Sequence, residues 1–507
     1  MHDPHVLIIG GGTGGLFTGA LLAKEGFRVT VLEKNREAGG GLQCFERYGE
    51  TFETGMHTLG GFEAGGSLDR ICRYLGIRER LRLRADDCLA SIRYLSDDCQ
   101  YRLPKGRAAF ADYLCGLFPA EAPGIRAYVD ELYRLADEVD LFYLRESGDA
   151  IPSHSEQFLW AADRLIAHFA ADPKLRDALA FLNPLYSGQA GHSPAYLHAL
   201  INVLYIDGPC RFVDGSRQLA NALADVIRSA GGTVDTANGA TAIEMADREV
   251  TGVRSADGQT HRADVYISAV HPCTLLRLLP PEAFTRAYRQ RLESIPDTYS
   301  AFTVFAVLRP GCFPYLDHTC YYQDQYGLAW RHGEAPGPRW PRGFMYFTPP
   351  VSGQGPYARK LIVNCVMPFS EVAQWAGTHV PGRRGPAYEA WKQARLEQVL
   401  ERMETLHPGF GRYVAHAFAA SPLTIRDYYA TRAGALFGYR KDCTQPALSY
   451  LPVRTKVRNL LLTGQNVNLH GICGVPLTAI TTAEALTGRN HILRKLNQSG
   501  NEPAHIC

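Results

Sequence analysis

Residues 6–34 read VLIIGGGTGGLFTGALLAKEGFRVTVLEK, which predicts an apolar strand, a glycine-rich turn, a helix and a second strand. The turn has the spacing Gly10-x-Gly12-x-x-Gly15 of a dinucleotide-binding βαβ unit. Gly10 permits a tight turn, Gly12 lets the backbone approach a pyrophosphate, and Gly15 lets the helix pack closely on the strand. Glu33 ends the second strand, where a carboxylate can accept hydrogen bonds from a ribose diol. Because the glycines stand between a strand and a helix, the pattern predicts a nucleotide site.

A second glycine-rich stretch follows directly. Residues 35–63 read NREAGGGLQCFERYGETFETGMHTLGGFE, with three glycines at 39–41. The stretch resembles a large flavoprotein class that includes phytoene desaturases, amine oxidases and retinol saturases, in which such glycines expose backbone N–H groups to the pyrophosphate. The arginine usual in that class just after the glycines is absent, because Leu42 and Gln43 stand there. A mobile loop is the alternative interpretation of these glycines.

The third informative stretch lies near the far end of the chain. Residues 459–490 read NLLLTGQNVNLHGICGVPLTAITTAEALTGRN, which predicts a short strand, a turn at Gly464 and a helix after Gly471. This stretch resembles the C-terminal flavin motif of the phytoene desaturase and retinol saturase families. Residues 424–442, TIRDYYATRAGALFGYRKD, also resemble those families. The resemblance therefore has N-terminal, intermediate and C-terminal anchors.

The resemblance implies FAD as cofactor. The residues that it and the glycine pattern assign to the FAD site are Gly10, Gly12, Thr13, Gly14, Gly15, Glu33, Lys34, Gly40, Gly41, Leu42, Ala240, Gly464, Gln465, Gly474, Val475 and Pro476.

Two histidines are candidates for the acid–base chemistry. His57 lies just past the glycines, in a region that passes near the flavin ring in resembling flavoproteins, and His470 lies inside the C-terminal motif. Either imidazole can donate a proton near neutral pH. The alternative for each is a structural histidine bonded to the backbone or to the flavin edge. Tyr428 and Tyr429 are weaker acid candidates that are more typical of packed aromatic residues.

Composition bounds the class of protein. The chain has 507 residues, 46% of them hydrophobic and 21% charged, with a net charge of +2, as in a soluble globular enzyme. No basic tract suggests a nucleic-acid partner, and no apolar run reaches the length of a spanning helix. Thirteen scattered cysteines and the lack of a secretory signal favour a reduced, cytoplasmic chain. No metal-ligand spacing, GxSxG elbow or P-loop appears, so no metal site, hydrolase or kinase is predicted.

One basic stretch has two interpretations, and one of them is contact with a membrane surface. Arg78, Arg80, Arg82 and Arg84 alternate at period two, which predicts that they share one face of an extended segment. A solvated edge is the favoured interpretation. Peripheral contact with an anionic lipid surface is the alternative.

The fold class follows from the positions of the predicted FAD-binding segments along the chain. Residues 212–269 read as a helix ended by glycines at 231 and 232, then three strands, a hairpin and a returning strand. We therefore expect an α/β protein with a discontinuous Rossmann-like FAD domain of the glutathione-reductase and amine-oxidase type, and a substrate domain of mixed sheet plus helices. The predicted boundaries are 1–85, 205–280 and 440–496 for the FAD domain, 86–204 and 281–439 for the substrate domain, and 497–507 for a tail.

The substrate domain is predicted to bind a hydrophobic molecule. An amphipathic helix is predicted from Ile125 to Phe142, and aromatic residues are dense in residues 300–348. A sheet core explains the aromatic residues, and an apolar pocket over the flavin is the functional alternative. No second GxGxxG appears, so a nicotinamide donor would have to enter from the substrate side.

Three functions remain from these patterns. The first is an FAD-dependent oxidoreductase that saturates, desaturates or isomerises a polyene or other hydrophobic alkene, similar to phytoene desaturases, carotenoid isomerases and retinol saturases. The second is a flavin amine oxidase, which an aromatic cage of two tyrosines would favour. The third is a non-catalytic lipid-binding chaperone of the same fold, against which Glu33 and the C-terminal glycines argue. The sequence leaves the exact substrate, the electron partner and the oligomeric state open.

Overall fold

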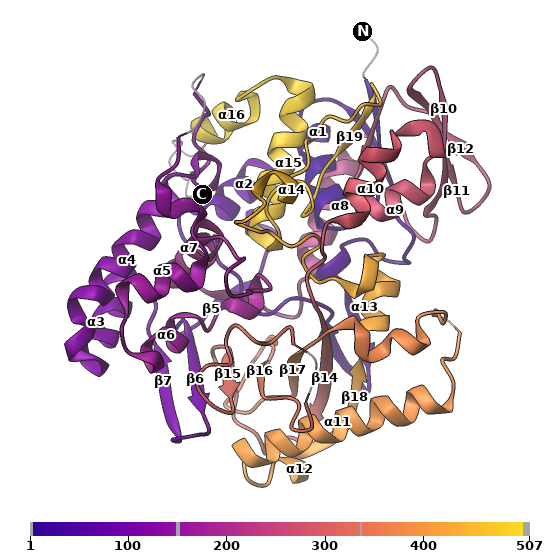
Figure 1. Ribbon diagram of the computed structural model, residues 1–507. Helices are drawn as coiled ribbons and strands as arrows, with labels where there is room; N and C mark the ends of the chain where they lie inside the picture. The colour runs from indigo at the N-terminus through magenta and orange to yellow at the C-terminus, as the bar shows by residue number, and fades with distance from the viewer. Residues whose placement is uncertain (1–3, 149–152, 335–336, 381, 500–507) are drawn as a thin grey trace.

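Two main sheets, set apart in space, organise the protein (Figure 1). The structure is a computed structural model that describes residues 4–148, 153–334, 337–380 and 382–499. One sheet has five strands and the other seven, and the chain passes between them several times.

The five-stranded sheet is parallel throughout. Its spatial order is β19 (Leu460–Leu462), β13 (Val265–Ser268), β1 (His5–Ile9), β2 (Arg28–Leu32) and β9 (Thr233–Asp235). In β1, residues 6–9 are at most 2% exposed. A parallel strand covered on both faces reads as a continuous apolar run, which is why VLII carries no polar alternation.

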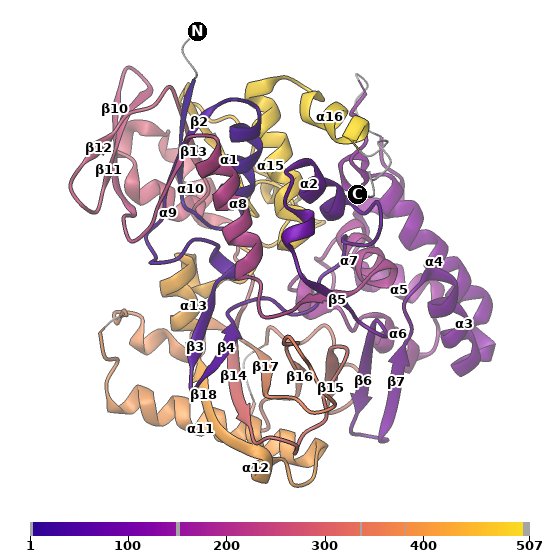
Figure 2. The same cartoon turned by 180° about the vertical axis from the view of Figure 1, so that it is seen from behind.

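Helices lie against this sheet and against one another, and small residues line the closest contacts. The helices are α1 (Thr13–Lys24), α2 (Ser67–Tyr74), α8 (Arg217–Ser229), α15 (Gly471–Thr487) and α16 (His491–Ser499). The first of them, α1, contacts both α8 and α15 (Figure 2). A Cβ atom on Gly14 would lie 2.9 Å from the Cα of Gly464, and one on Gly19 would lie 2.9 Å from the side chain of Ile227. Larger residues would push these elements apart.

The elements predicted for residues 212–269 are present. α8 ends at Ser229, and Gly231 follows with φ +80°. The three-stranded sheet is formed by β10 (Ala240–Ala246), β11 (Glu249–Ser255) and β12 (Thr260–His261). The chain then returns to the five-stranded sheet through β13, as expected from the sequence, and β13 pairs with β1. Two helices follow, α9 (Pro272–Leu278) and α10 (Arg286–Ser294).

The seven-stranded sheet is antiparallel except at one junction. Its order is β18 (Val414–Ala420), β14 (Ser300–Leu308), β17 (Lys360–Met367), β16 (Gly343–Phe347), β15 (Cys320–Gln323), β6 (Ala90–Tyr94) and β7 (Cys99–Leu103). Only β15 and β6 pair in parallel. The dense aromatic residues of 300–348 lie largely in this sheet, as the sheet-core interpretation predicted.

Each face of the seven-stranded sheet has a partner. Figure 1 shows α11 (Pro386–Leu406) and α12 (Phe410–Tyr413) beneath it, and Val399 and Met403 join the core on that side. On the other face, Phe52 packs with Phe305 and Phe347. Phe52 belongs to the hairpin of β3 (Cys44–Arg47) and β4 (Glu50–Glu53), so this hairpin links the two sheets.

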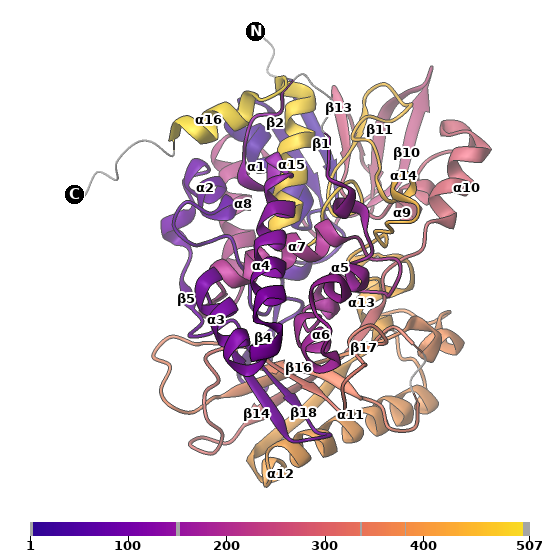
Figure 3. The same cartoon turned by 60° about the vertical axis from the view of Figure 1, so that its left-hand side comes forward.

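A helical group lies beside the sheets (Figure 3). It contains α3 (Arg107–Leu117), α4 (Ala122–Asp137), α5 (Ala162–Phe169), α6 (Pro173–Leu179) and α7 (Ala195–Asp207). The predicted amphipathic helix is α4, but the prediction that it continues to Phe142 is wrong. It ends at Asp137, and Phe142 lies in a short 3-10 turn, because Val139 leaves the helical backbone with φ −106° and ψ 86°. The remaining elements are β5 (Leu83–Ala85), β8 (Cys210–Phe212), α13 (Pro422–Tyr429) and α14 (Pro446–Ser449).

The arginine-rich stretch has internal partners. Arg78, Arg80 and Arg82 form ion pairs with carboxylates of the same chain, and Arg84 lies over the ring of Tyr315. The prediction that the four arginines share one face is wrong, because residues 78–80 form a turn of 3-10 helix. Contact of this stretch with anionic lipid stays a prediction.

The two main sheets take their strands from different segments of the chain. All strands of the five-stranded sheet lie within 1–85, 205–280 and 440–496, and all strands of the seven-stranded sheet lie in the two intervening segments. The domain boundaries themselves stay a prediction. Residues 497–499 of the predicted tail belong to α16, and residues 500–507 lie outside the described residues. None of the described helices combines the length and apolar composition that crossing a membrane requires.

Candidate functional site

A cavity of about 290 Å³, here named the cofactor cavity, lies at the carboxyl ends of β1 and β2. Ligands of open α/β sheets bind outside these strand ends. The predicted cofactor residues that line it are Gly10, Gly12, Thr13, Gly14, Glu33, Lys34, Gly40, Gly41, Ala240, Gly464, Gln465 and Val475. The cavity therefore draws on the N-terminal unit, the β10 strand and the C-terminal motif together.

The glycine turn leaves room for a pyrophosphate. Gly10 has φ +103°, a conformation that side chains rarely adopt. A Cβ atom on Gly15 would lie 2.0 Å from the carbonyl oxygen of Gly10, so this glycine lets the helix start against the strand. At Gly12, by contrast, a Cβ atom would meet nothing within 4 Å. The backbone of Gly12 therefore borders open space at the helix N-terminus, which fits the phosphates of a dinucleotide.

Glu33 is fixed by backbone donors at the end of β2. Its Oε2 accepts from the amide of Gly11 at 2.8 Å, and its Oε1 accepts from the amide of Asn35 at 2.8 Å. Burial raises the pKa of this carboxyl group, and the two backbone hydrogen bonds counteract that shift. Because each carboxylate oxygen has a second acceptor site, Glu33 can still accept from a ribose hydroxyl.

The second glycine run is held against the first. The amide of Gly39 donates to the carbonyl of Gly11 at 2.7 Å, and Gly39 and Gly12 form a β-bridge. A Cβ atom on Gly40 would lie 3.2 Å from the Cα of Gly12. These contacts favour the phosphate-binding interpretation of the run over a mobile loop.

Four of the assigned residues lie off the wall of the cofactor cavity: Gly15, Leu42, Gly474 and Pro476. Leu42 is 1% exposed in the core, and its carbonyl oxygen lies 3.1 Å from the hydroxyl oxygen of Ser216. Gly474 lines a neighbouring cavity. A cofactor role of these four residues stays a prediction.

The end of helix α13 lines the cofactor cavity and is bonded to the residues that follow β2. Lys34 Nζ donates to the carbonyl of Asp427, and Asn35 Nδ2 donates to the carbonyl of Tyr428 at 3.0 Å. The carboxylate of Asp427 is itself held by Arg384 at 2.6 Å. Tyr429 and Phe437 also line the cavity, although their role in it was not assigned from the sequence. The resemblance of residues 424–442 to the phytoene desaturase and retinol saturase families was the signal that could have placed both residues at the cofactor site.

Two further cavities adjoin the first. The helix cavity, about 110 Å³, is lined mainly by α7 and α15, and the sheet cavity, about 130 Å³, by β14–β17. Both are lined by Gly55, His57, Leu185 and Phe437. Gly55 and Phe437 line all three cavities. This junction is where the cofactor side meets the substrate side.

His57 stands at the junction with an unused ring nitrogen. Its Nδ1 is buried and has no hydrogen-bond partner among the described residues. Its ring lies parallel to that of Tyr205, with centroids 6.4 Å apart. Burial lowers the pKa of His57 to about 4, so the imidazole is neutral at neutral pH. A buried polar atom without a partner points to a ligand at this position.

His470 is engaged with the backbone. Its Nε2 donates to the carbonyl of Leu185 at 3.1 Å, and its ring lies 4.8 Å from that of Phe437. Burial also lowers the pKa of His470 to about 4. Because a carbonyl can only accept, Nε2 carries the proton of the neutral ring. This arrangement favours the structural alternative for His470, and its catalytic role stays a prediction.

The walls of the substrate-side cavities are uncharged. Among the described residues, no Asp, Glu, Lys or Arg lines the helix cavity or the sheet cavity. The polar groups of the sheet cavity include Gln323 and His332, 3.1 Å apart, and burial lowers the pKa of His332 to about 4. Tyr299 lines both the sheet cavity and an outer cavity of about 660 Å³. Tyr299 therefore lies between the outer cavity and the sheet cavity, which His57 also lines.

A single dinucleotide-binding unit, completed by a C-terminal motif and facing an apolar cavity, defines a flavoprotein oxidoreductase. A family model described as flavin containing amine oxidoreductase matches residues 13–487, and the chain belongs to that family. Its cofactor is FAD.

Known proteins resemble the chain over nearly its whole length. The human all-trans-retinol 13,14-reductase is 25% identical, with 96% of this chain and 86% of that protein covered. The phytoene desaturase (neurosporene-forming) of Cereibacter sphaeroides is 24% identical, with 93% and 91% covered. A solved structure of a putrescine oxidase has a TM-score of 0.63 at 15% identity, with 96% of this chain and 99% of that chain covered, and shows the same fold.

Proposed function

We propose that the protein oxidises, reduces or isomerises a carbon–carbon bond in a long, hydrophobic, conjugated substrate. The observation that carries this proposal is the uncharged wall of the helix and sheet cavities. A neutral apolar molecule gains burial free energy there. Two of the relatives are named as a reductase of retinol and a desaturase of phytoene, which supports a polyene without fixing the direction of the reaction.

The cofactor residues hold FAD in this proposal. Gly10, Gly12 and Gly40 supply backbone to the pyrophosphate, and Glu33 accepts from the ribose. FAD, when bound, supplies hydride exchange with carbon. The chain must then place the substrate, exclude water and handle the proton.

His57 is the residue we assign to the proton. Addition or loss of hydrogen across a double bond needs a proton at the carbon next to the one that exchanges hydride. The buried Nδ1 of His57 has no hydrogen-bond partner in the described part of the chain, and His57 lines both substrate-side cavities. A neutral imidazole can donate from one nitrogen or accept at the other. His470 holds Leu185 in place, and Leu185 lines the same two cavities.

A cationic amine finds less support. An ammonium group in an apolar cavity needs a carboxylate or an aromatic cage. The sheet cavity has three tyrosines, Tyr299, Tyr321 and Tyr429, but no carboxylate among the described residues that line it. The likeness to a putrescine oxidase concerns the fold.

The test is an anaerobic titration of the purified yellow protein with two ligand series, followed through the flavin absorption bands. We expect a spectral response to conjugated polyenes that strengthens with chain length. At roughly 0.8 kcal/mol per buried carbon unit, removal of two carbons should weaken binding about tenfold. A response to amines, with none to polyenes of any length, would establish the amine oxidase alternative. A colourless protein that still binds polyenes would establish the non-catalytic lipid carrier.

A further inference from the structure

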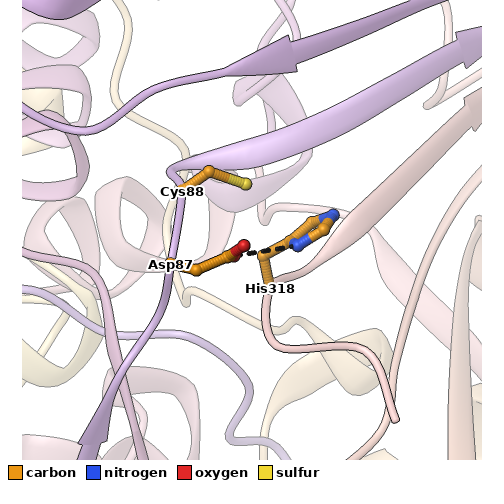
Figure 4. Close-up of side chains that lie close together, drawn as sticks. All are labelled: Asp87, Cys88 and His318. Atoms are coloured by element: carbon orange, nitrogen blue, oxygen red, sulfur yellow. Dashed lines mark hydrogen bonds and ion pairs between the residues drawn. The ribbon is translucent and has the colours of Figure 1, made fainter. Parts of the chain in front are cut away.

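Three side chains of types that bind metals converge outside the walls of the cofactor, helix and sheet cavities. Asp87 and Cys88 lie just before β6, and His318 lies just before β15 (Figure 4). One ligand atom from each lies within 4.8 Å of the other two. Asp87 and His318 are 231 residues apart in the chain, so no sequence spacing announced the cluster.

A single imidazole nitrogen is the centre of the cluster. His318 Nδ1 lies 3.1 Å from Oδ1 of Asp87 and 3.1 Å from Oδ1 of Asp317. The other oxygen of Asp87 pairs with Arg102, which leaves Oδ1 directed to the imidazole. The thiol of Cys88 is buried, whereas the carboxylates of Asp87 and Asp317 are 35% and 41% exposed. The donors are therefore buried on one side and open to solvent on the other.

We propose that Asp87, Cys88 and His318 bind a zinc ion, with Asp317 or water as the fourth ligand. Thiolate, imidazole and carboxylate are the ligand types of protein zinc sites. Bonds of roughly 2.0–2.3 Å in a tetrahedron place neighbouring ligand atoms about 3.3–3.6 Å apart. The 3.1 Å separations at His318 Nδ1 are close to that spacing.

The ring of His318 already has the outer partner that a zinc ligand needs. Its Nε2 lies 3.1 Å from the hydroxyl of Ser91. With Nδ1 on the metal, Nε2 carries the proton and donates to Ser91. Such outer hydrogen bonds fix the orientation of a ligating imidazole.

A buried network fixes both ligand-bearing segments. Asp86 accepts from Arg211 at 2.7 Å and from the hydroxyl of Thr58 at 2.9 Å. The same hydroxyl lies 2.7 Å from that of Thr319. Asp86 directly precedes Asp87, and Thr319 directly follows His318. The donors are therefore positioned by the fold before any metal arrives.

The position of the cluster assigns it a structural role. The hairpin β6–β7 joins the rest of the seven-stranded sheet only through the pairing of β6 with β15, from Ser91 and Cys320 to Tyr94 and Gln323. Zinc bound at the start of β6 and β15 would hold these two strands together. None of the three ligands lines the cofactor, helix or sheet cavity, so the inference does not depend on the proposed function.

The test is the zinc content of the full-length, FAD-loaded protein. Protein purified without chelator is incubated with Zn²⁺, desalted and analysed by inductively coupled plasma mass spectrometry. We expect about one zinc per chain. Replacement by Co²⁺ should add thiolate-dependent ligand-field bands at wavelengths beyond the flavin bands.

Matched variants separate this site from adventitious binding. Cys88→Ser and His318→Gln should lose the zinc, whereas Cys72→Ser, which changes a buried thiol in α2, should keep it. Asp87→Asn changes an exposed side chain and should fold, with zinc affinity at least tenfold weaker. Zinc should raise the unfolding temperature of the unchanged protein more than that of Asp87→Asn. Zinc near zero in the unchanged protein, or equal zinc in Cys88→Ser, would overturn the site, and bound zinc without a thermal shift would overturn its structural role.

Discussion

Ser216 holds the buried carboxyl group of Glu53 with two hydrogen bonds. Its amide donates to Oε1 at 3.0 Å, and its hydroxyl donates to Oε2. Glu53 ends β4 and Ser216 precedes α8, so the pair joins the linking hairpin to a helix of the first sheet. Burial raises the pKa of Glu53 to about 7, against the opposing effect of these hydrogen bonds.

This pair predicts a pH-dependent stability. The folded state keeps the proton on Glu53 up to about pH 7, whereas the unfolded chain loses it near pH 4.5. The stabilisation by protonation is therefore complete below about pH 4.5 and is lost as the pH rises to about 7. Over that range it amounts to on the order of 3 kcal/mol in the free energy of unfolding. Urea unfolding across the range should show a weaker decline for Glu53→Gln than for the unchanged protein. The control is Glu46→Gln, an exposed residue of the same hairpin; equal slopes in all three proteins would contradict the prediction.

Gly12 predicts a folded protein that cannot hold FAD. A Cβ atom at this position has no protein atom within 4 Å but enters the space assigned to the pyrophosphate. Gly12→Val should therefore purify colourless, with the circular dichroism of the FAD-free protein unchanged. Gly355→Val is the matched control, because Gly355 also has open surroundings, lies in an exposed loop and has no positive φ. Full yellow colour in Gly12→Val would show that the pyrophosphate lies elsewhere.

Glu33→Ala should weaken FAD retention without abolishing it. The substitution removes an acceptor for the ribose and also the anchor of two backbone amides. Dissociation constants from flavin fluorescence should rise by a factor on the order of ten, the cost of one or two hydrogen bonds. An unchanged constant would exclude Glu33 from the ribose site.

The two histidines should differ when replaced by glutamine. His57→Gln should retain FAD and lower the turnover rate by at least about a hundredfold, with little change in KM, since a proton transfer is lost. His470→Gln should affect stability more than turnover, because the hydrogen bond to Leu185 is structural. With its pKa near 4, His57 should add no inflection to the rate profile between about pH 5 and 8. A larger rate loss in His470→Gln would reverse the assignment.

The electron source should not be NADPH alone. The described residues contain a single parallel sheet with a glycine turn of the dinucleotide type. In anaerobic stopped-flow measurements, NADPH without substrate should bleach the flavin slowly or not at all, whereas dithionite should bleach it fully. Rapid bleaching by NADPH would reveal a nicotinamide site that the fold does not suggest.

Local patterns predicted the cofactor half of the molecule well. The glycine spacing, the buried strand before it and the elements of residues 212–269 depend on neighbours close in sequence, and each appears where it was expected. The turn geometry of Gly10 and Gly15 follows from the same local constraint. By contrast, periodicity overestimated α4, because an apolar stripe continues past the point where the backbone leaves the helix.

Pairings between distant segments could not be predicted. Nothing in the residues of β6 indicates that β15 lies beside it, because strand propensity does not encode the partner. The approach of Asp87 to His318 depends on that pairing. The lining of the helix and sheet cavities depends on similar long-range contacts, which is why Leu185 and Phe437 were absent from the expected site.

The last strand of the first sheet sets the order in which this protein can mature. β19 pairs with β13, and the loop after β19 brings Gly464 against α1. During synthesis the glycine turn therefore leaves the ribosome long before the strand and helix that complete its cavity. We therefore expect the nascent chain to retain FAD only after nearly all of it has been made. Truncated products should consequently be colourless, and cofactor supply should matter only at the end of translation.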